Sequence, residues 1–242
     1  MRALEGNTAV VAGGSRGIGL AVARVLVGAG ARTTLLARNA HELEARTGEL
    51  GGGDAAHAIR CDLRDRADVE RAALAIRERF GEAPDILVNS AGVFHLARVE
   101  EFTDTDFADA LAVNLVAPFR LMRAFLPEMR RRRRGHIVSI GSVADHTTFP
   151  ENGAYAASKH GLRALHNVLR AELHGSGVRA TLVSPGPVDT SLWDSIHPPP
   201  ERREGFTPRE RMLEADSVAA AVMYALLQPP TVNVDLVRLS RS

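Results

Sequence analysis

Short apolar runs alternate with amphipathic stretches along almost the whole chain. Seven of these runs are rich in Val, Ile, Leu and Thr and are short enough to be buried strands. A strand, a helical stretch and a further strand follow one another repeatedly, which is typical of a parallel sheet whose crossover connections are helices. The expected strands are residues 8–13, 32–37, 56–62, 85–91, 135–142, 178–185 and 233–239.

The stretches between these strands carry apolar residues at helical spacing. In one of them Val69, Ala73 and Ile76 fall on the same helical face. Pro118 lies inside the longest stretch and predicts a kink there. The predicted fold class is α/β: one doubly wound domain over residues 1–242, with a seven-stranded, mostly parallel sheet and helices on both faces. The helices expected from spacing are residues 18–30, 67–81, 104–129 and 153–175.

Residues 186–212 break this alternation, because they are rich in proline and charge. They follow the carboxyl end of the sixth expected strand, and ligands of open α/β sheets bind at that edge. We therefore expect a substrate lid within residues 186–215 of the domain. A mobile surface loop is the alternative.

Composition excludes several other kinds of protein. The formal net charge is +1, so no overall field favours nucleic acid or an acidic membrane. The five arginines at 130–134 follow a predicted helix, where they complement its dipole, and we prefer a solvated helix end to a nucleic-acid patch. The single cysteine, Cys61, excludes an intramolecular disulfide and is expected to be a small buried residue. No metal site is expected.

The chain shows no sign of a membrane or secretory segment. No window approaches 18 uninterrupted apolar residues, so no membrane span is expected. The apolar run near the N-terminus is short and ends in glycines, which fits a buried strand better than a signal peptide. The expected location is the cytoplasm.

A glycine-rich loop comes directly after the first expected strand and opens the first helix. Its glycines follow G-x-x-x-G-x-G spacing. Glycines there let the main chain turn tightly and approach a pyrophosphate, which the free N–H groups of the helix N-terminus would bind. Glycines alone are weak support, but this placement between strand and helix strengthens it. The residues expected to contact a dinucleotide here are Gly13, Ser15, Arg16, Gly17, Ile18 and Gly19.

The end of the second expected strand indicates which dinucleotide is bound. An NAD site places Asp or Glu there to hold the ribose 2′-hydroxyl, but this chain has Arg38 and Asn39. Arg38 and Arg16 together would clamp a 2′-phosphate, for which the guanidinium fork is suited. NADP(H) is therefore expected as the cofactor. The alternative for Arg38 is an ordinary surface residue, since the chain has 29 arginines.

The chain has a single lysine, Lys159, four residues after one of its two tyrosines, Tyr155. On a helix this pair lies on one face, one turn apart. A phenol has a pKa near 10, and a neighbouring ammonium is expected to lower the pKa of Tyr155. A compact ammonium also has donors for ribose hydroxyls, which a planar guanidinium would not place in the same space. With only two tyrosines in the chain, chance placement is a weak alternative.

These motifs resemble the short-chain dehydrogenase/reductase family. The elements GGSRGIG, CDL, NSAG, NLVAPF, SIGS, YAASK and SPGPVDT occur in the family's order, and the resemblance covers residues 5 to about 190. Ser142 precedes Tyr155 by 13 positions, which is the spacing in that family. The resemblance implies a Rossmann-type domain and an oxidoreductase.

The resemblance also implies the roles of four residues. Tyr155 would be the general acid/base, Ser142 would hydrogen-bond the substrate oxygen, and Lys159 would hold the nicotinamide ribose. Asn114 resembles the asparagine that holds a water beside the lysine in a proton relay. Without the resemblance, Asn114 would be read as a residue of the helix kink.

Further cofactor contacts are implied by the same resemblance. Asp62 and Leu63 would contact adenine, and the NSAG turn would line the cofactor. The SPGPVDT segment would pass the nicotinamide and contact its carboxamide. The residues implied are Asp62, Leu63, Asn89, Ala91, Gly92, Pro185, Gly186, Val188 and Thr190.

Three features depart from the family pattern. Ala12 stands where a threonine is usual, so one hydrogen bond to the NSAG turn is missing. Ser90 replaces the commoner second asparagine, and both changes are expected to affect stability. The C-terminus lacks the Gly-rich ending of β-ketoacyl carrier-protein reductases, and it is more similar to members that act on 3-hydroxy acids or small alcohols.

The expected function is a cytoplasmic NADP(H)-dependent oxidoreductase that interconverts a small-molecule ketone or aldehyde with an alcohol. The alternative is a protein that senses NADP(H) without catalysis, although such relatives usually lose the tyrosine or the lysine. A nucleotide-sugar epimerase or dehydratase is disfavoured by chain length and glycine spacing. No nucleic-acid or membrane partner is expected. A homodimer or homotetramer is expected by analogy, since residues 104–129 and 153–175 resemble the family's interface helices.

A partly apolar substrate pocket is also expected. Its candidate wall residues are aromatic, with histidines and arginines near them. A histidine in a loop is more often only solvated, and the arginines leave an acidic substrate open. The candidates are Phe94, His95, Arg98, His146, Phe149, Trp193 and Arg202.

Overall fold

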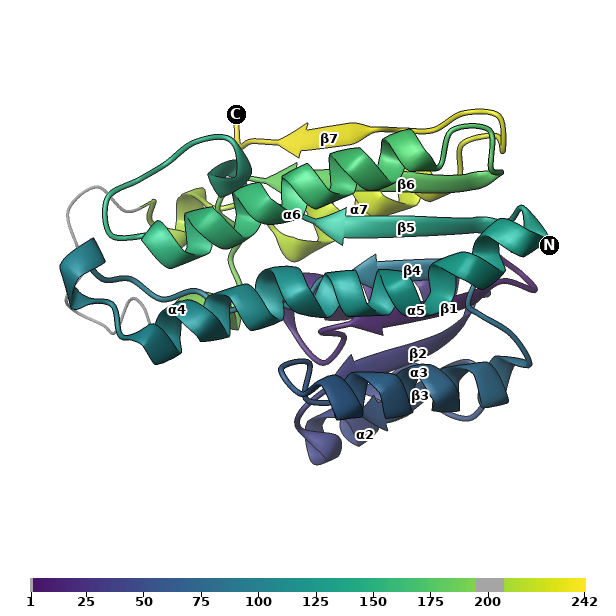
Figure 1. The fold of residues 1–242 in the computed structure, drawn as a ribbon. Coiled ribbons are helices and arrows are strands. Elements are labelled where there is room, and N and C mark those ends of the chain that lie inside the picture. The colour runs from purple at the N-terminus through teal and green to yellow at the C-terminus, as the bar shows by residue number, and fades with distance from the viewer. Residues whose placement is uncertain (1, 195–206) are drawn as a thin grey trace.

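A computed structural model describes residues 2–194 and 207–242 of the chain. It contains a seven-stranded sheet in the order β3-β2-β1-β4-β5-β6-β7, and every strand pairing in the described residues is parallel (Figure 1). The predicted α/β fold is therefore confirmed. The strands are β1 Thr8–Ala12, β2 Arg32–Ala37, β3 Ala56–Arg60, β4 Ile86–Asn89, β5 Gly135–Ile140, β6 Val178–Pro185 and β7 Leu236–Leu239.

The last strand begins later than its sequence pattern suggests. Asn233 lies before β7 and its side chain, rather than its main chain, pairs with Ala180 of β6. The Asn233 amide accepts from the Ala180 N–H at 2.9 Å and donates to the Ala180 carbonyl at 3.0 Å. A side-chain amide thus takes the place of one step of the strand ladder.

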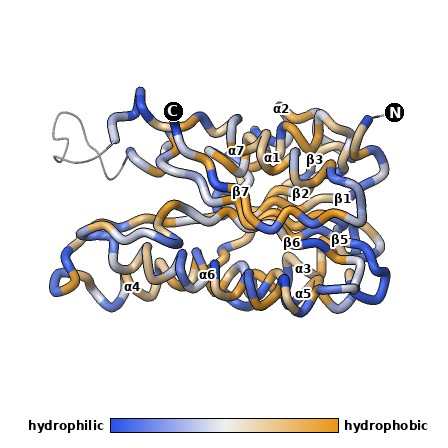
Figure 2. The backbone as a smooth tube through the Cα atoms, turned by 90° about the horizontal axis from the view of Figure 1, so that it is seen from above, coloured by the Kyte–Doolittle hydropathy of each residue, from blue (hydrophilic) through white to orange (hydrophobic). Residues whose placement is uncertain are grey.

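Helices cover both faces of the sheet (Figure 2). One face carries α1, α2 and α7, and the other carries α3, α4, α5 and α6. Short single-turn helices, η1 Val99–Glu101, η3 Val143–Asp145, η4 Ser191–Trp193 and η5 Arg209–Arg211, lie in the connections. The main helices are α1 Gly17–Gly28, α2 Ala40–Glu49, α3 Arg66–Phe80, α4 Asp104–Leu111, α5 Ala117–Arg132, α6 Gly153–Glu172 and α7 Ala215–Leu226.

Two of these helices, α2 and α7, were not among those expected from spacing. Helix α2 buries only Leu43 and Thr47, so it has too few apolar positions to show a face. Helix α7 is apolar almost throughout, and a short apolar run does not distinguish helix from strand. The Asn39 side chain caps α2 by accepting from the Glu42 N–H at 3.1 Å, a signal that was present in the sequence.

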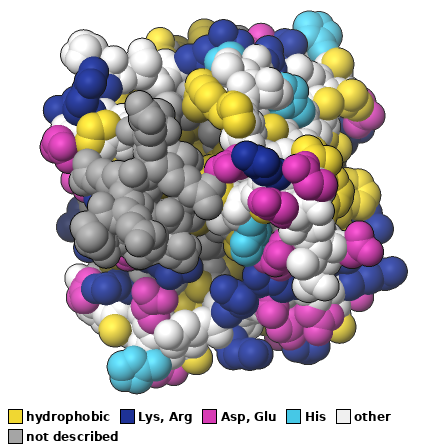
Figure 3. All heavy atoms as spheres, turned by 90° about the vertical axis from the view of Figure 1, so that its left-hand side faces the viewer, with side chains coloured by type: hydrophobic (Ala, Val, Ile, Leu, Met, Phe, Trp, Pro, Cys, Tyr) yellow, Lys and Arg dark blue, Asp and Glu magenta, His cyan; other side chains and the backbone are white. Residues whose placement is uncertain are grey.

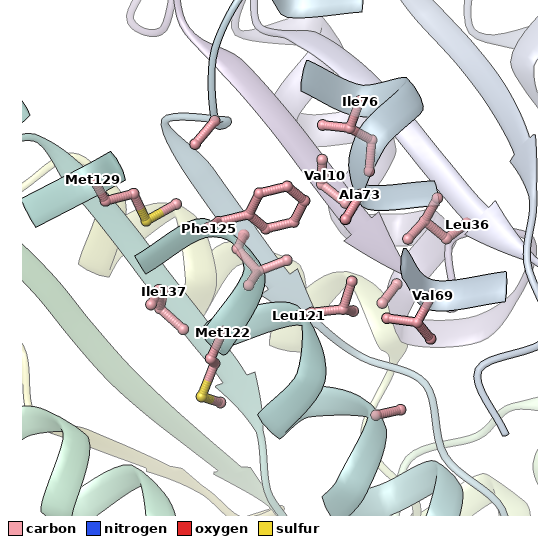
Figure 4. Close-up of a cluster of buried hydrophobic side chains, with 14 of the residues drawn as sticks. Val10, Leu36, Val69, Ala73, Ile76, Leu121, Met122, Phe125, Met129 and Ile137 are labelled. Atoms are coloured by element: carbon pink, nitrogen blue, oxygen red, sulfur yellow. The ribbon is translucent and has the colours of Figure 1, made fainter. Parts of the chain in front are cut away.

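Each face of the sheet has its own apolar cluster. The cluster beneath α3, α5 and α6 includes Phe125, Leu121 and Met129 of α5 (Figure 4). The second lies beneath α1 and α7 and includes Leu26 and Val222. Strands β1 and β4 are buried on both sides and are mostly apolar, which explains why the sequence pattern located them well. Cys61 is fully buried, as expected, and burial raises its pKa to about 11.

The long helix expected at 104–129 is divided by one π turn. Helix α4 passes into η2, Ala112–Val116, and then into α5. Pro118 has no N–H, so it cannot donate to the carbonyl four residues earlier. The Ala117 N–H instead reaches back five residues to the Ala112 carbonyl. A π turn therefore stands where the proline predicted a kink.

Within the described residues, one helical run, Asp104–Arg132, is long and apolar enough to cross a membrane by length and composition. Leu121, Phe125 and Met129 of this run are fully buried against the sheet and α3. These three side chains of the run are thus part of the core.

The five arginines at the end of α5 are each engaged locally. Arg132 pairs with Glu82 at 2.7 Å, and Arg134 pairs with the buried Asp85 at 3.0 Å. Of the others, Arg130 pairs with Glu172 at the end of α6, Arg131 pairs with Glu128 on α5, and Arg133 donates to the Gly175 carbonyl after α6. The run thus joins α5 to neighbouring segments at the amino-end edge of the sheet.

Ala12 stands where a threonine is usual in the family, and polar groups at the end of β4 lack hydrogen-bond partners. Ala12 pairs in register with Asn89, and both line a small void that has no room for water. Neither polar atom of the buried Asn89 side chain has a hydrogen-bond partner, and the Ser90 hydroxyl has none. Such groups cost free energy when they are desolvated.

We predict that Ala12→Thr stabilises the protein by about 1 kcal/mol, because its hydroxyl would pair with Asn89 and its methyl would fill the void. Urea denaturation would measure the change. Ala12→Val is the matched control, since it has the same shape without a hydroxyl. Equal stabilisation by the two variants would contradict the proposed hydrogen bond.

Candidate active site

One large cavity, of about 1200 Å³, lies at the carboxyl-end edge of the sheet. Its lining comes from the segments that directly follow β1 to β6, together with α6. Figure 3 views the molecule from this edge, where side chains of both charges are mixed over the surface. The predicted site residues that line the cavity are Gly13, Ser15, Arg16, Gly17, Ile18, Gly19, Arg38, Asn39, Leu63, Ala91, Gly92, Ser142, Tyr155, Lys159, Pro185, Gly186, Val188 and Thr190.

The glycine loop packs so closely that side chains would not fit. A Cβ on Gly13 would lie 2.7 Å from the main chain of Ala91, and a Cβ on Gly19 would lie 2.0 Å from the Gly13 carbonyl oxygen. Gly13 also has a φ of +81°, which favours glycine. No side chain caps the N-terminus of α1, whose first residues line the cavity. Its N–H groups and positive dipole end therefore face the space where a phosphate would bind.

The second strand delivers Arg38 and Asn39 to the same cavity as Arg16. A fourth residue, not expected from the sequence, lies at this end as well. Glu42, in the first turn of α2, also lines the cavity, and its carboxylate accepts from the Ser15 hydroxyl at 3.1 Å. This end of the cavity therefore combines two guanidiniums with one carboxylate.

Three predicted catalytic side chains converge at the other end of the cavity. Ser142 follows β5 at the start of η3, where its hydroxyl oxygen accepts from the Ala144 N–H at 3.1 Å. Tyr155 and Lys159 lie one turn apart on α6, with Lys159 Nζ 5.6 Å from the centre of the Tyr155 ring. The buried Lys159 ammonium donates to the Ile140 carbonyl at 2.9 Å. This bond joins α6 to the end of β5, two residues before Ser142.

Burial governs the acidity of this pair. Burial raises the pKa of Tyr155, hydrogen bonding by Ser142 lowers it, and the charge of Asp145 raises it further. Burial lowers the pKa of Lys159 to about 8, while the charge of Asp145 acts in the opposite direction. The phenol pKa thus moves opposite to the sequence-based expectation, because desolvation of the phenolate is its largest cause.

Three predicted site residues do not line the cavity. Asn114 is fully buried in the π turn, and its amide bonds the N–H and carbonyl of Val93 at 2.9 Å each and the Ser158 hydroxyl at 3.0 Å. It therefore ties the segment after β4 to α6. Asp62 accepts from the Arg64 N–H at 3.1 Å, and Asn89 ends β4 beneath the cavity.

An aromatic cluster forms one wall near the catalytic side chains. The Phe94 ring lies 4.6 Å from the Tyr155 ring and 5.5 Å from the Trp193 ring, measured between centres. Trp193 donates from its indole nitrogen to the Val188 carbonyl at 2.9 Å. Phe149 lines the cavity as well, so the partly apolar wall expected from the sequence is present.

The polar candidates for substrate contact lie elsewhere. Neither His95 nor His146 lines the cavity; His95 lies 3.4 Å from Asp109, and His146 bonds Asp145 at 2.7 Å. Arg98 begins η1 and does not line the cavity either. Arg202 lies outside the described residues, as does part of the expected lid. The parts of that region on either side are joined by a parallel bridge between Val188 and Leu213.

Comparison with known proteins agrees with this geometry. The family described as short chain dehydrogenase matches residues 7–201. The chain is 38% identical over 226 residues to D-threitol dehydrogenase of Mycolicibacterium smegmatis, a match that covers 91% of this chain and 86% of that protein.

Two solved structures have the same fold along nearly their full length. One is a metagenomic short-chain oxidoreductase in complex with NADP, with 33% identity, a TM-score of 0.84 and 99% coverage of both chains. The other is an alcohol dehydrogenase from the archaeon Thermococcus sibiricus complexed with 5-hydroxy-NADP, with 31% identity, a TM-score of 0.85, and coverage of 96% of this chain and 95% of that one. With the family match, these similarities show that the chain belongs to the short-chain dehydrogenase family of oxidoreductases.

Proposed function

We propose that this protein is an NADP(H)-dependent oxidoreductase of the cytoplasm that interconverts a ketone or aldehyde with an alcohol. The observation that carries the proposal is the convergence of Ser142, Tyr155 and Lys159 on a cavity that also contains the glycine loop. A proton donor, a hydrogen-bond donor for an oxyanion and an ammonium are the groups that carbonyl reduction needs.

The cavity fits a nicotinamide dinucleotide. The close packing at Gly13 and Gly19 leaves room for a pyrophosphate at the uncapped start of α1. Arg16 and Arg38 would hold a 2′-phosphate, and similar solved structures contain NADP and 5-hydroxy-NADP. When bound, the cofactor supplies or accepts the hydride.

The chain's own residues would manage the proton. The raised pKa of Tyr155 keeps its phenol protonated at neutral pH, so that it can donate to the substrate oxygen during reduction. The Ser142 oxygen accepts from the Ala144 N–H, and the same hydroxyl hydrogen-bonds Tyr155, so the two hydroxyls would share a substrate oxygen bound between them. One of the three Lys159 N–H donors serves Ile140, which leaves two for ribose hydroxyls.

The described wall favours an apolar substrate. Phe94, Phe149 and Trp193 line the catalytic end, whereas Arg16 and Arg38 line the dinucleotide end. We therefore place simple aryl or alkyl carbonyl compounds ahead of 3-hydroxy acids and of polyols such as the threitol for which one relative is named. A sensor without catalysis would not need the proton donor and the ammonium, so their presence favours an enzyme.

A homo-oligomer is also proposed, as a dimer or a tetramer. The outer sides of α4, α5 and α6 expose the apolar side chains of Phe107, Phe119 and Val168. Exposed apolar groups on neighbouring helices are typical of a surface that another subunit covers.

We predict that the protein oxidises NADPH with an aryl ketone such as acetophenone, and that Tyr155→Phe lowers kcat/KM by about 10²-fold to 10⁴-fold because the proton donor is lost. NADPH affinity should change little, which cofactor fluorescence would measure. Tyr224→Phe, at the other tyrosine, is the matched control because it lies exposed on α7. NADPH binding without turnover across a panel of carbonyls would support the sensor instead.

The lowered pKa of Lys159 predicts how kcat/KM depends on pH. The Lys159 ammonium is present below a pKa of about 8 and is lost above it, so kcat/KM for reduction should fall as pH rises through about 8. Lys159→Arg should abolish this fall and lower the plateau by about 10-fold to 100-fold, because a wider cation misplaces its neighbours. Arg170→Lys on the exposed side of α6 is the control. A Lys159→Arg enzyme with the wild-type profile would exclude the lysine from this role.

Cofactor preference depends on the charges near Arg38. Arg38→Gln should raise KM for NADPH about 10-fold to 100-fold and leave NADH unchanged, because one charged partner of the 2′-phosphate is lost. Glu42→Gln should lower KM for NADPH, since a like charge is removed. Arg24→Gln, on an exposed position of α1, serves as the control. The NADP preference would be refuted by an Arg38→Gln enzyme that keeps its wild-type ratio of NADPH to NADH activity.

A further inference from the structure

Asp145 is the most deeply buried carboxylate next to the proposed catalytic residues, with 1% of its surface exposed. It lies at the end of η3, three residues after Ser142, and does not line the cavity. Nothing in the proposed proton transfer uses it directly. A carboxylate buried so close to the site needs a physical account, because its desolvation is costly unless its oxygens are fully partnered.

Both carboxylate oxygens of Asp145 are partnered. Oδ2 accepts from the main-chain N–H of Ser142 at 3.3 Å and from the Ser184 hydroxyl on β6. Oδ1 accepts from His146 Nδ1 at 2.7 Å and pairs with Arg163 of α6 at 3.6 Å. The carboxylate therefore connects the Ser142 main chain to β6 and to the catalytic helix.

The main chain is shaped around this carboxylate. A Cβ on Gly141 would lie 2.5 Å from Asp145 Oδ2 and 2.8 Å from the Ser184 hydroxyl. Only a glycine before Ser142 lets the carboxylate come so near. Arg163 also donates to the Asp145 main-chain carbonyl at 3.3 Å, so it contacts both the main chain and the carboxylate of Asp145.

We propose that Asp145 is a positioning residue, which fixes the main chain of Ser142 and holds a negative charge against the catalytic helix α6. This inference rests on the proposed function of the site. The charged and titratable groups in contact with Asp145 are Arg163 from α6 and His146 from its own turn, while β6 presents the Ser184 hydroxyl. The charge of Asp145 also acts on Tyr155 and Lys159 of α6. The negative charge favours the ammonium and opposes the phenolate, which keeps both groups protonated.

The inference is tested by two substitutions with opposite expected effects. Asp145→Asn keeps the shape and removes a negative charge, so the phenol of Tyr155 should titrate at lower pH. Arg163→Gln removes the positive partner of Asp145, so the carboxylate charge is less compensated and the phenol should titrate at higher pH. Shifts of about one pH unit in each direction are expected.

The titration can be followed without enzyme activity. The chain has two tyrosines, so NMR of isotope-labelled tyrosine gives two signals, and Tyr224→Phe assigns them. For the active protein, Asp145→Asn should also lower kcat/KM about 10-fold and move the alkaline fall in activity to lower pH. Asp85→Asn is the matched control, since this buried carboxylate pairs with Arg134 at the opposite edge of the sheet and should alter only stability.

The outcomes separate this inference from the proposed function. Opposite shifts of the Tyr155 signal in the two variants support the role of Asp145, whether or not any carbonyl is turned over. Should Asp145→Asn fail to fold, the upward shift in Arg163→Gln decides. Unchanged titration in the folded variants, or the same shift in Asp85→Asn, overturns the proposal even when the wild-type enzyme is active.

Discussion

The hydrogen bond from Lys159 to the Ile140 carbonyl organises the catalytic end of this molecule. It joins the buried ammonium of α6 to the last residue of β5, and Ser142 follows two residues later. Because Tyr155 lies one turn before Lys159, the same bond holds the turn of α6 that carries the phenol next to the end of β5. The ammonium is almost fully desolvated, so the bond and the nearby negative charge are what make its burial tolerable.

The dinucleotide end depends on a second constraint, the contact between the glycine loop and the turn after β4. At Gly13 the main chain lies against Ala91 with no space for a side chain. Asn114 in turn holds Val93 of the same segment against α6. The two ends of the cavity are thus linked through one short segment after β4. Ala91 of this segment packs against the glycine loop, and Val93 is hydrogen-bonded to Asn114.

The sequence predicted the central strands β1 and β4 well because they are mostly apolar and buried on both faces, whereas the exposed edge strand β7 begins later than predicted. It also predicted the cavity residues that belong to contiguous motifs. It missed Glu42 and Asp145 because their partners are distant in the chain: Ser15 lies 27 residues from Glu42, and Ser184 lies 39 residues from Asp145. The direction of the Tyr155 pKa shift could not be predicted, because desolvation depends on how completely the folded chain surrounds the phenol. Asn114 was recognised only by resemblance, and its hydrogen bonds to Val93 and Ser158 follow from the π turn.

The near absence of lysine has a chemical consequence. All other basic side chains of the Lys/Arg class are guanidiniums, which stay charged at high pH and react poorly with acylating reagents. The protein therefore has one side-chain primary amine, and this amine lines the cavity with a pKa of about 8. Apart from the chain terminus, an amine-directed label small enough to enter would mark this location and no other.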